Sequence, residues 1–178
     1  MQEPSIRAPR LPRLVVVDDV QDNLWLMERL FDGRFEVVAA SSGQQALALA
    51  AAEPLPDLVL LDILMPDMDG YTILSRLQTL KAEGEYLPVI VLTADVSREA
   101  RHRALALGAH DFLTKPFDVV EVVLRVWNLL ETRQLHQRLR TLAVSGTIIC
   151  YPLGGMLAGL FAGQVLPLAG WRPLFWIG

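Results

Sequence analysis

Five short apolar runs along the chain alternate with five longer segments in which apolar residues recur at every third or fourth position. Short runs of this kind predict β-strands, and the three- and four-residue spacing predicts helices with one buried face. Two of the runs, residues 14–17 (LVVV) and 89–92 (VIVL), contain no polar residue, as in strands covered by helices on both sides. The alternation therefore predicts an α/β domain of βα units around a parallel sheet.

The same pattern sets the boundaries of each element. The predicted strands cover residues 14–17, 35–39, 58–61, 89–92 and 111–113. The predicted helices cover residues 23–31, 43–52, 71–81 and 98–107, and a last helix starts at Val119. Gly33, Gly84 and Gly108 follow three of these helices, where a left-handed cap is common. A (βα)5 chain of this size is typical of the flavodoxin-like doubly wound parallel sheet with strand order 2-1-3-4-5.

Charge divides the chain into two parts. All 20 Asp and Glu residues lie before position 141, and the only Lys or Arg beyond Arg140 is Arg172. We expect a disordered N-terminal arm over residues 1–12, a folded domain over 13–130, a helical linker over 131–143 and an apolar tail over 144–178. The folded part is acidic and has no basic stripe, which argues against direct contact with nucleic acid.

The expected location follows from the first residues of the chain. The segment MQEPSIRAPRLP holds arginines and prolines but no apolar core of a signal peptide. We therefore expect the folded domain to stay in the cytoplasm. The single cysteine, Cys150, cannot form an internal disulfide.

Three carboxylates follow two of the predicted strands. Asp18 and Asp19 stand at the end of the first strand, and Asp62 stands at the end of the third. Functional residues of such sheets lie at the carboxyl ends of the strands, so the fold is expected to bring these acids together. A group of carboxylates and hard oxygen ligands suits Mg²⁺. Each acid taken alone is equally typical of a polar strand end that enters a turn.

A hydroxyl and an ammonium group are expected at the same edge. Thr93 ends the fourth strand and Lys115 follows the fifth. A phosphorylated carboxylate is a mixed anhydride, and its phosphoryl oxygens need a metal ion, a hydrogen-bond donor and a cation. Mg²⁺, Thr93 and Lys115 supply one of each.

At this point the chain resembles the response-regulator receiver domains of two-component signalling, through LVVVDD, LVLLDILMPDMDG, VIVLTA and DFLTKPFD in that order. The resemblance covers residues 13–130 and implies that Asp62 is the phosphoacceptor. It gives Asp19 a direct role at Mg²⁺ and Asp18 a more water-mediated one. The backbone carbonyl of Leu64 is the remaining protein ligand that it implies.

The resemblance also assigns roles to residues at the ends of the later strands. Thr93 is expected to bind the phosphoryl group, Lys115 to pair with it, and Phe112 to act as an aromatic switch, although Phe112 also suits a plain core position. In the MPDMDG segment, Pro66 and Gly70 suit a loop that folds back over the site, with the glycine supplying unusual dihedrals.

The implied function is that of a signalling domain and not of an ordinary enzyme. A sensor histidine kinase or a phosphotransfer protein is expected to phosphorylate Asp62 in a Mg²⁺-dependent step, with self-catalysed phosphotransfer and dephosphorylation as the only chemistry. Phosphorylation is expected to change the face formed by the fourth helix, the fifth strand and the fifth helix. A homodimer through that face is a further expectation, and the output domain is expected to be absent from this chain.

Other readings of the same fold fit the residues less well. A haloacid-dehalogenase-like phosphatase needs a second Asp two positions after its nucleophile, where this chain has Leu64. A flavodoxin needs a phosphate-binding loop after the first strand, where this chain has acids that repel phosphate. A pseudo-receiver, which serves only as a docking surface, usually lacks one of the key residues, and none is missing here.

The helix that starts at Val119 continues well beyond a receiver's last helix, because the sequence has no Gly or Pro between Pro116 and Gly146. Its apolar stripe fits either a short coiled coil or an exposed amphipathic linker. The NLLETRQLHQRL segment resembles the linkers of HD-GYP-type regulators. The metal ligands of an HD-GYP domain are absent, so no phosphodiesterase activity is expected.

The tail over 144–178 holds one charged residue, Arg172. A stretch of ~20 apolar residues is long enough to span a bilayer, so contact with the inner membrane is expected through this tail. A buried helical hairpin or an apolar docking segment fits the same composition. The tail resembles a fragment of a major facilitator superfamily transporter, and one or two spans cannot build a transport pathway. The junction therefore suggests a gene fusion, a truncated product or an assembly error.

Overall fold

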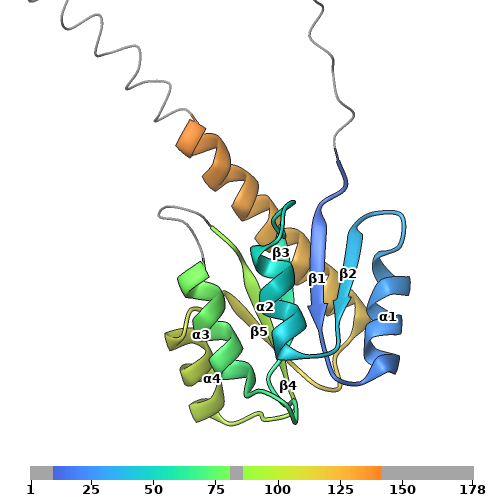
Figure 1. The fold of residues 1–178 in the computed structure, drawn as a ribbon, viewed down its shortest axis with the longest axis vertical. Helices are drawn as coiled ribbons and strands as arrows, with labels where there is room; N and C mark the ends of the chain where they lie inside the picture. The colour runs from blue at the N-terminus through green and yellow to red at the C-terminus, as the bar shows by residue number, and fades with distance from the viewer. Residues whose placement is uncertain (1–9, 81–85, 142–178) are drawn as a thin grey trace, which may run out of the picture. The chain divides into compact units, whose positions relative to one another are not determined.

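The structure is a computed structural model that describes residues 10–80 and 86–141. The chain divides into two compact units, Met1–Gln134 and Leu135–Gly178. The first unit contains the whole sheet (Figure 1). The predicted tail over 144–178 and the predicted arm up to residue 9 lie outside the described residues.

A five-stranded parallel sheet forms the centre of the first unit. The strands are β1 (Arg13–Val17), β2 (Glu36–Ala40), β3 (Leu58–Asp62), β4 (Val89–Thr93) and β5 (Asp111–Thr114). Their order is β2-β1-β3-β4-β5, which confirms the predicted flavodoxin-like arrangement. Every residue of β1, β3 and β4 is buried, whereas β2 is partly exposed, as expected for an edge strand.

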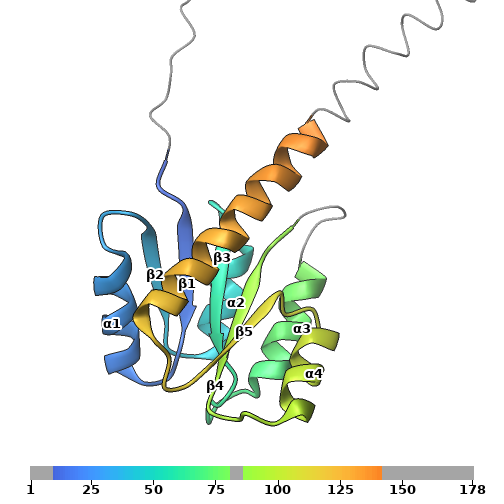
Figure 2. The same cartoon turned by 180° about the vertical axis from the view of Figure 1, so that it is seen from behind.

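Helices cover both faces of the sheet (Figures 1 and 2). They are α1 (Gln21–Phe31), α2 (Gly43–Ala51), α3 (Gly70–Leu80), α4 (Arg98–Ala106) and a last helix over residues 119–141. Apolar side chains of α2, α3 and α4 pack on one face, and those of α1 and the last helix pack on the other. The sheet and the helices on its two sides form the three layers of a doubly wound fold.

Serine caps and glycine turns define several helix ends. The hydroxyls of Ser42 and Ser97 accept hydrogen bonds from the first turns of α2 and α4. Gly33 (φ 69°) and Gly108 (φ 95°) adopt the left-handed conformation predicted after α1 and α4. Gly84, for which the same was predicted, lies outside the described residues.

Gly70 serves a purpose that the sequence analysis misjudged. Its φ is not in the left-handed region, so unusual dihedrals are not the reason for the glycine. A Cβ atom at this position would lie 2.4 Å from the Cα of Ile63 and 2.8 Å from the carbonyl oxygen of Asp62. The start of α3 therefore lies directly against the end of β3, and only a residue without a side chain fits there.

The last helix is held along the sheet by apolar and polar contacts. Val122, Val126 and Leu130 are buried against the sheet. Farther along, the Nε atom of Arg133 lies 3.3 Å from the Oδ1 atom of Asp57, which precedes β3. The helix thus continues past residue 130, as predicted. Among residues 10–80 and 86–141, no helix is both long and apolar enough to cross a membrane.

Candidate functional site

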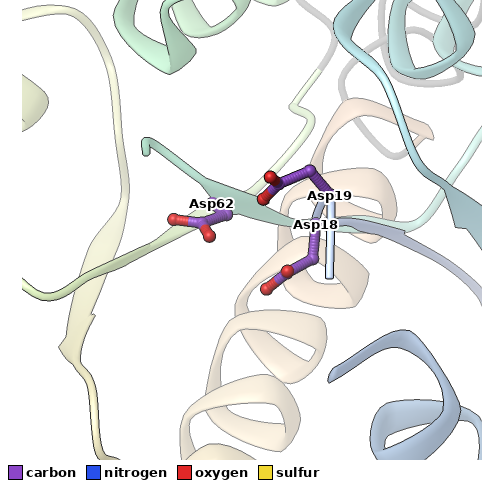
Figure 3. Close-up of side chains that lie close together, drawn as sticks. All are labelled: Asp18, Asp19 and Asp62. Atoms are coloured by element: carbon purple, nitrogen blue, oxygen red, sulfur yellow. The ribbon is translucent and has the colours of Figure 1, made fainter. Parts of the chain in front are cut away.

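Three carboxylates lie together at the carboxyl edge of the sheet (Figure 3). Asp18 and Asp19 directly follow β1, and Asp62 ends β3, which pairs with β1. Oxygens of all three side chains lie within 4.8 Å of one another. Asp18 and Asp62 are buried, whereas Asp19 is exposed to solvent. The structure therefore brings together the acids that the sequence analysis singled out.

Lys115 bridges two of these carboxylates. Its Nζ atom lies 2.7 Å from the Oδ2 atom of Asp18 and 2.6 Å from the Oδ2 atom of Asp62. The backbone N–H of Lys115 donates to the carbonyl oxygen of Thr93 at 2.7 Å, which fixes the start of the loop after β5 beside β4. Lys115 thus reaches the acids from the loop after β5, two strands away from β3.

Burial and charge act together on the titration of this cluster. Burial raises the pKa of Asp62 above its ordinary value, although hydrogen bonds from Lys115 and from the N–H of Leu64 lower it in part. Burial by itself lowers the pKa of Lys115, but hydrogen bonds to Asp18 and Asp62 outweigh that effect and raise it. Lys115 thus forms an ion pair with each of two buried carboxylates, Asp18 and Asp62.

Asn23 is a site residue that the sequence analysis missed. Its side-chain amide donates to both carboxylate oxygens of Asp18, at 3.0 and 2.9 Å. The N–H of Val20 donates to Asp18 as well, at 2.9 Å. These bonds hold Asp18 in a fixed orientation. The signal in the sequence is weak, because an asparagine near the start of a helix has many ordinary roles.

The remaining predicted residues lie around the acids. Thr93 is buried at the end of β4, and its hydroxyl oxygen accepts a hydrogen bond from the N–H of Asp95 at 3.0 Å. The N–H of Leu64 donates to the Oδ1 atom of Asp62 at 3.0 Å, and the Leu64 side chain is exposed. Phe112 is partly buried against the core on the α3 and α4 side of the sheet.

The donor set fits a divalent cation. Asp18, Asp19 and Asp62 carry three negative charges when ionised, and Lys115 supplies one positive charge within 2.7 Å of Asp18 and Asp62. The remaining charge of about −2 would be balanced by the +2 charge of Mg²⁺, whose preferred ligands are oxygens. Because Asp19 is exposed, water can reach this side of the site. The cluster of three carboxylates is therefore suited to a hydrated metal ion.

Comparisons with known proteins agree with this geometry. The profile of the family described as "Response regulator receiver domain" matches residues 14–126. Response regulator PleD of Caulobacter vibrioides is 39% identical over 151 residues, which are 84% of this chain and 32% of PleD. Transcriptional regulatory protein PrrA of Mycobacterium tuberculosis is 42% identical over 123 residues, which are 68% of this chain and 51% of PrrA.

A solved structure shows the same fold. Chemotaxis protein CheY4 of Vibrio cholerae superposes with a TM-score of 0.61 and 25% identity, and the match covers 67% of this chain and 99% of CheY4. The chain thus spans about a third to a half of the curated relatives named above and nearly all of the CheY4 chain.

Proposed function

The chain belongs to the response regulator receiver domain family, and on that premise we propose that Asp62 is the carboxylate that accepts the phosphoryl group. The observation that supports this choice is the position of its two oxygens. Oδ2 lies 2.6 Å from Nζ of Lys115, and Oδ1 accepts the N–H of Leu64 at 3.0 Å. Whichever oxygen attacks phosphorus, the other is still held by a donor.

The donor is a phosphorylated histidine on a partner kinase or phosphotransfer protein. In the transfer, an oxygen of Asp62 forms a bond to phosphorus while the phosphorus–nitrogen bond breaks, and the histidine nitrogen leaves with the electron pair and takes a proton. The product is an acyl phosphate. Hydrolysis of that anhydride by water returns the carboxylate and inorganic phosphate.

We assign the residues around Asp62 to the charge that the phosphoryl group brings. Lys115 pairs with a phosphoryl oxygen, and the hydroxyl of Thr93 turns from the N–H of Asp95 to donate to another. Asp18, Asp19 and the backbone carbonyl of Leu64 are the proposed ligands of Mg²⁺, together with Asp62. The metal ion, when bound, supplies positive charge that stabilises the transferring phosphoryl group.

The consequence of phosphorylation is a change on the surface of α4, β5 and the last helix. Thr93 ends β4, and Phe112 lies in the neighbouring strand β5, where it pairs with Val91. A movement of the Thr93 hydroxyl towards the phosphoryl group leaves space that the ring of Phe112 can fill. We propose that partners, including a second copy of the chain, read this altered face.

Beryllofluoride with Mg²⁺ tests this proposal, because it imitates a phosphoryl group on a carboxylate. In the full chain, we expect NMR signals of Thr93, Phe112 and the strands β4 and β5 to shift on its addition. Asp62→Asn should abolish the response, whereas Asp22→Asn, which removes an exposed acid from the first turn of α1, should preserve it. A docking module that is never phosphorylated would give no response, or one that Asp62→Asn leaves unchanged.

We also propose that the receiver domain covers residues 13–130, lies in the cytoplasm and is followed by a linker similar to those of HD-GYP-type regulators. For residues 144–178 we propose a transporter-like character and contact with the membrane. The last helix continues to residue 141, which supports a helical linker after residue 130.

A further inference from the structure

Helix α4 buries little apolar surface. Its buried side chains are Ala100 and Ala104. By comparison, α1 buries Leu24, Met27 and Phe31. Because the hydrophobic contribution grows with the apolar area removed from water, two alanine methyl groups anchor α4 much less than the larger side chains anchor α1. Other contacts must contribute to the docking of α4.

Two arginines of α4 supply such contacts by stacking on aromatic rings. The guanidinium carbon of Arg101 lies 5.0 Å from the ring centroid of Phe112 in β5. The guanidinium carbon of Arg103 lies 3.9 Å from the ring centroid of Tyr71 in α3, and its Nη2 atom lies 3.6 Å from Asp69. Cation–π contacts of this geometry are attractive. They tie α4 to the sheet and to α3.

A chain of hydrogen bonds joins the start of α4 to the site. The N–H of Asp95 donates to the hydroxyl oxygen of Thr93 at 3.0 Å, and the N–H of Ser97 donates to the Oδ1 atom of Asp95 at 2.8 Å. The hydroxyl of Ser97 in turn accepts the N–H of Ala100 at 3.2 Å, in the first turn of α4. When the Thr93 hydroxyl moves, the first bond of this chain breaks.

We propose that Arg101 is a positioning residue that holds Phe112 and α4 in their unphosphorylated arrangement. Arg103 makes a second such contact, on Tyr71, and we call these two cation–π contacts the arginine clasps. This inference rests on the proposed function, because the event that opposes the two clasps is the movement of Thr93 towards a phosphoryl oxygen. Contacts made only in the unphosphorylated state favour that state. Arg101 therefore sets how much of the protein adopts the switched arrangement for a given occupancy of Asp62.

The first test uses the full chain without phosphodonor, beryllofluoride or Mg²⁺. Arg101→Gln should speed amide hydrogen exchange in α4 by about two- to fivefold, the factor that corresponds to one exposed cation–π contact. Arg98→Gln is the matched control, because Arg98 is exposed in the same helix and stacks on no ring among residues 10–80 and 86–141. Equal effects of both substitutions, or no effect of either, would overturn the proposal.

The second test measures the switch itself. Arg101→Gln should lower the beryllofluoride concentration needed for half of the Phe112 response by the same factor of about two to five, because the competing state is destabilised. Arg101→Lys keeps the charge without the planar stack, so its effect should lie between those of wild type and Arg101→Gln.

The two proposals fail in different ways. A wild-type chain without any beryllofluoride response contradicts the phosphoacceptor assignment, whereas the exchange experiment still decides whether the clasp exists. A normal wild-type response with identical midpoints for Arg101→Gln and Arg98→Gln contradicts the clasp alone.

Discussion

Burial and hydrogen bonding shift the pKa of Asp62 in opposite directions. The residue is 4% exposed, and burial raises the pKa of its carboxyl group despite the donors at both oxygens. A raised pKa means that the folded chain holds this proton more tightly than the unfolded chain. The free energy of unfolding therefore falls as the pH rises from the ordinary value of 3.8 through the folded pKa. Above the folded pKa, the charged Asp62 carboxylate lowers the free energy of unfolding, because burial disfavours its ionised form.

Substitution of the two paired residues should therefore change stability in opposite directions. Asp62→Asn removes a carboxylate whose burial is unfavourable and should raise the free energy of unfolding at pH 7. Lys115→Gln leaves Asp18 and Asp62 without their cation and should lower it by about 1–3 kcal/mol. Urea unfolding without Mg²⁺ measures both. A loss of stability in Asp62→Asn would contradict the sign derived from burial.

Mg²⁺ should stabilise the folded chain through the same carboxylates. A ligand that binds only the folded state at a concentration 100 times its Kd adds about 2.7 kcal/mol. In wild type and in Asp22→Asn we expect the melting temperature to rise with Mg²⁺ and to fall again with a chelator. In Asp19→Asn the rise should be much smaller, because a proposed direct ligand is gone. The same rise in all three would place the ion elsewhere.

At the scale of elements, the close approach of β3 and α3 positions the site. Gly70 begins α3, and its N–H donates to the carbonyl oxygen of Ile63 at 3.2 Å. The segment from Asp62 to Gly70 is thereby closed into a tight loop. This loop carries Leu64, whose N–H holds the Oδ1 atom of Asp62. The close approach of β3 and α3 therefore helps to place the loop donor that orients the Asp62 carboxylate.

Gly70→Ala should therefore disturb the fold and the site together. The added Cβ would meet backbone atoms that cannot move independently, so we expect a loss of about 1–3 kcal/mol and a weaker beryllofluoride response. Gly33→Ala is the comparison, because open space surrounds that position and only its positive φ of 69° opposes the change. Its cost should be about 1–2 kcal/mol, with no effect on the site. Equal effects on the beryllofluoride response would show that close packing at Gly70 is unimportant.

At the scale of the whole molecule, an acidic signalling domain and an apolar tail share one chain. The receiver fold accounts for residues 14–126. The segment from Thr141 to Trp171 contains no charged residue. A receiver needs no such segment for its own stability, since its sheet is covered on both faces by its own helices. The apolar composition of residues 144–178 is therefore not explained by the needs of the receiver fold.

We predict that the tail binds membranes. Full-length protein should float with liposomes in a density gradient, whereas a chain that ends at Arg140 should stay at the bottom. The physical reason is the transfer of apolar side chains from water into the bilayer. Full-length protein that stays monomeric and unbound without detergent would contradict this prediction.

The sequence by itself determined the architecture and the place of the chemistry. Alternating apolar runs and periodic segments specify βα units, because burial of one helix face and of both strand faces leaves few arrangements. Parallel pairing then brings Asp18, Asp19 and Asp62, which follow or end their strands, to the same edge of the sheet. Gly33 and Gly108 were also readable, since a helix end with a glycine is a local signal.

Only the tertiary structure decided which side chains meet. Lys115 bridges Asp18 and Asp62, Asn23 orients Asp18, and Arg101 stacks on Phe112. Lys115 is distant in sequence from both of its partners, and Arg101 and Phe112 lie on different elements. A contact between such side chains depends on rotamers and helix rotation that no local pattern specifies. The purpose of Gly70 was hidden for the same reason, because a close approach is a property of two elements and not of one residue.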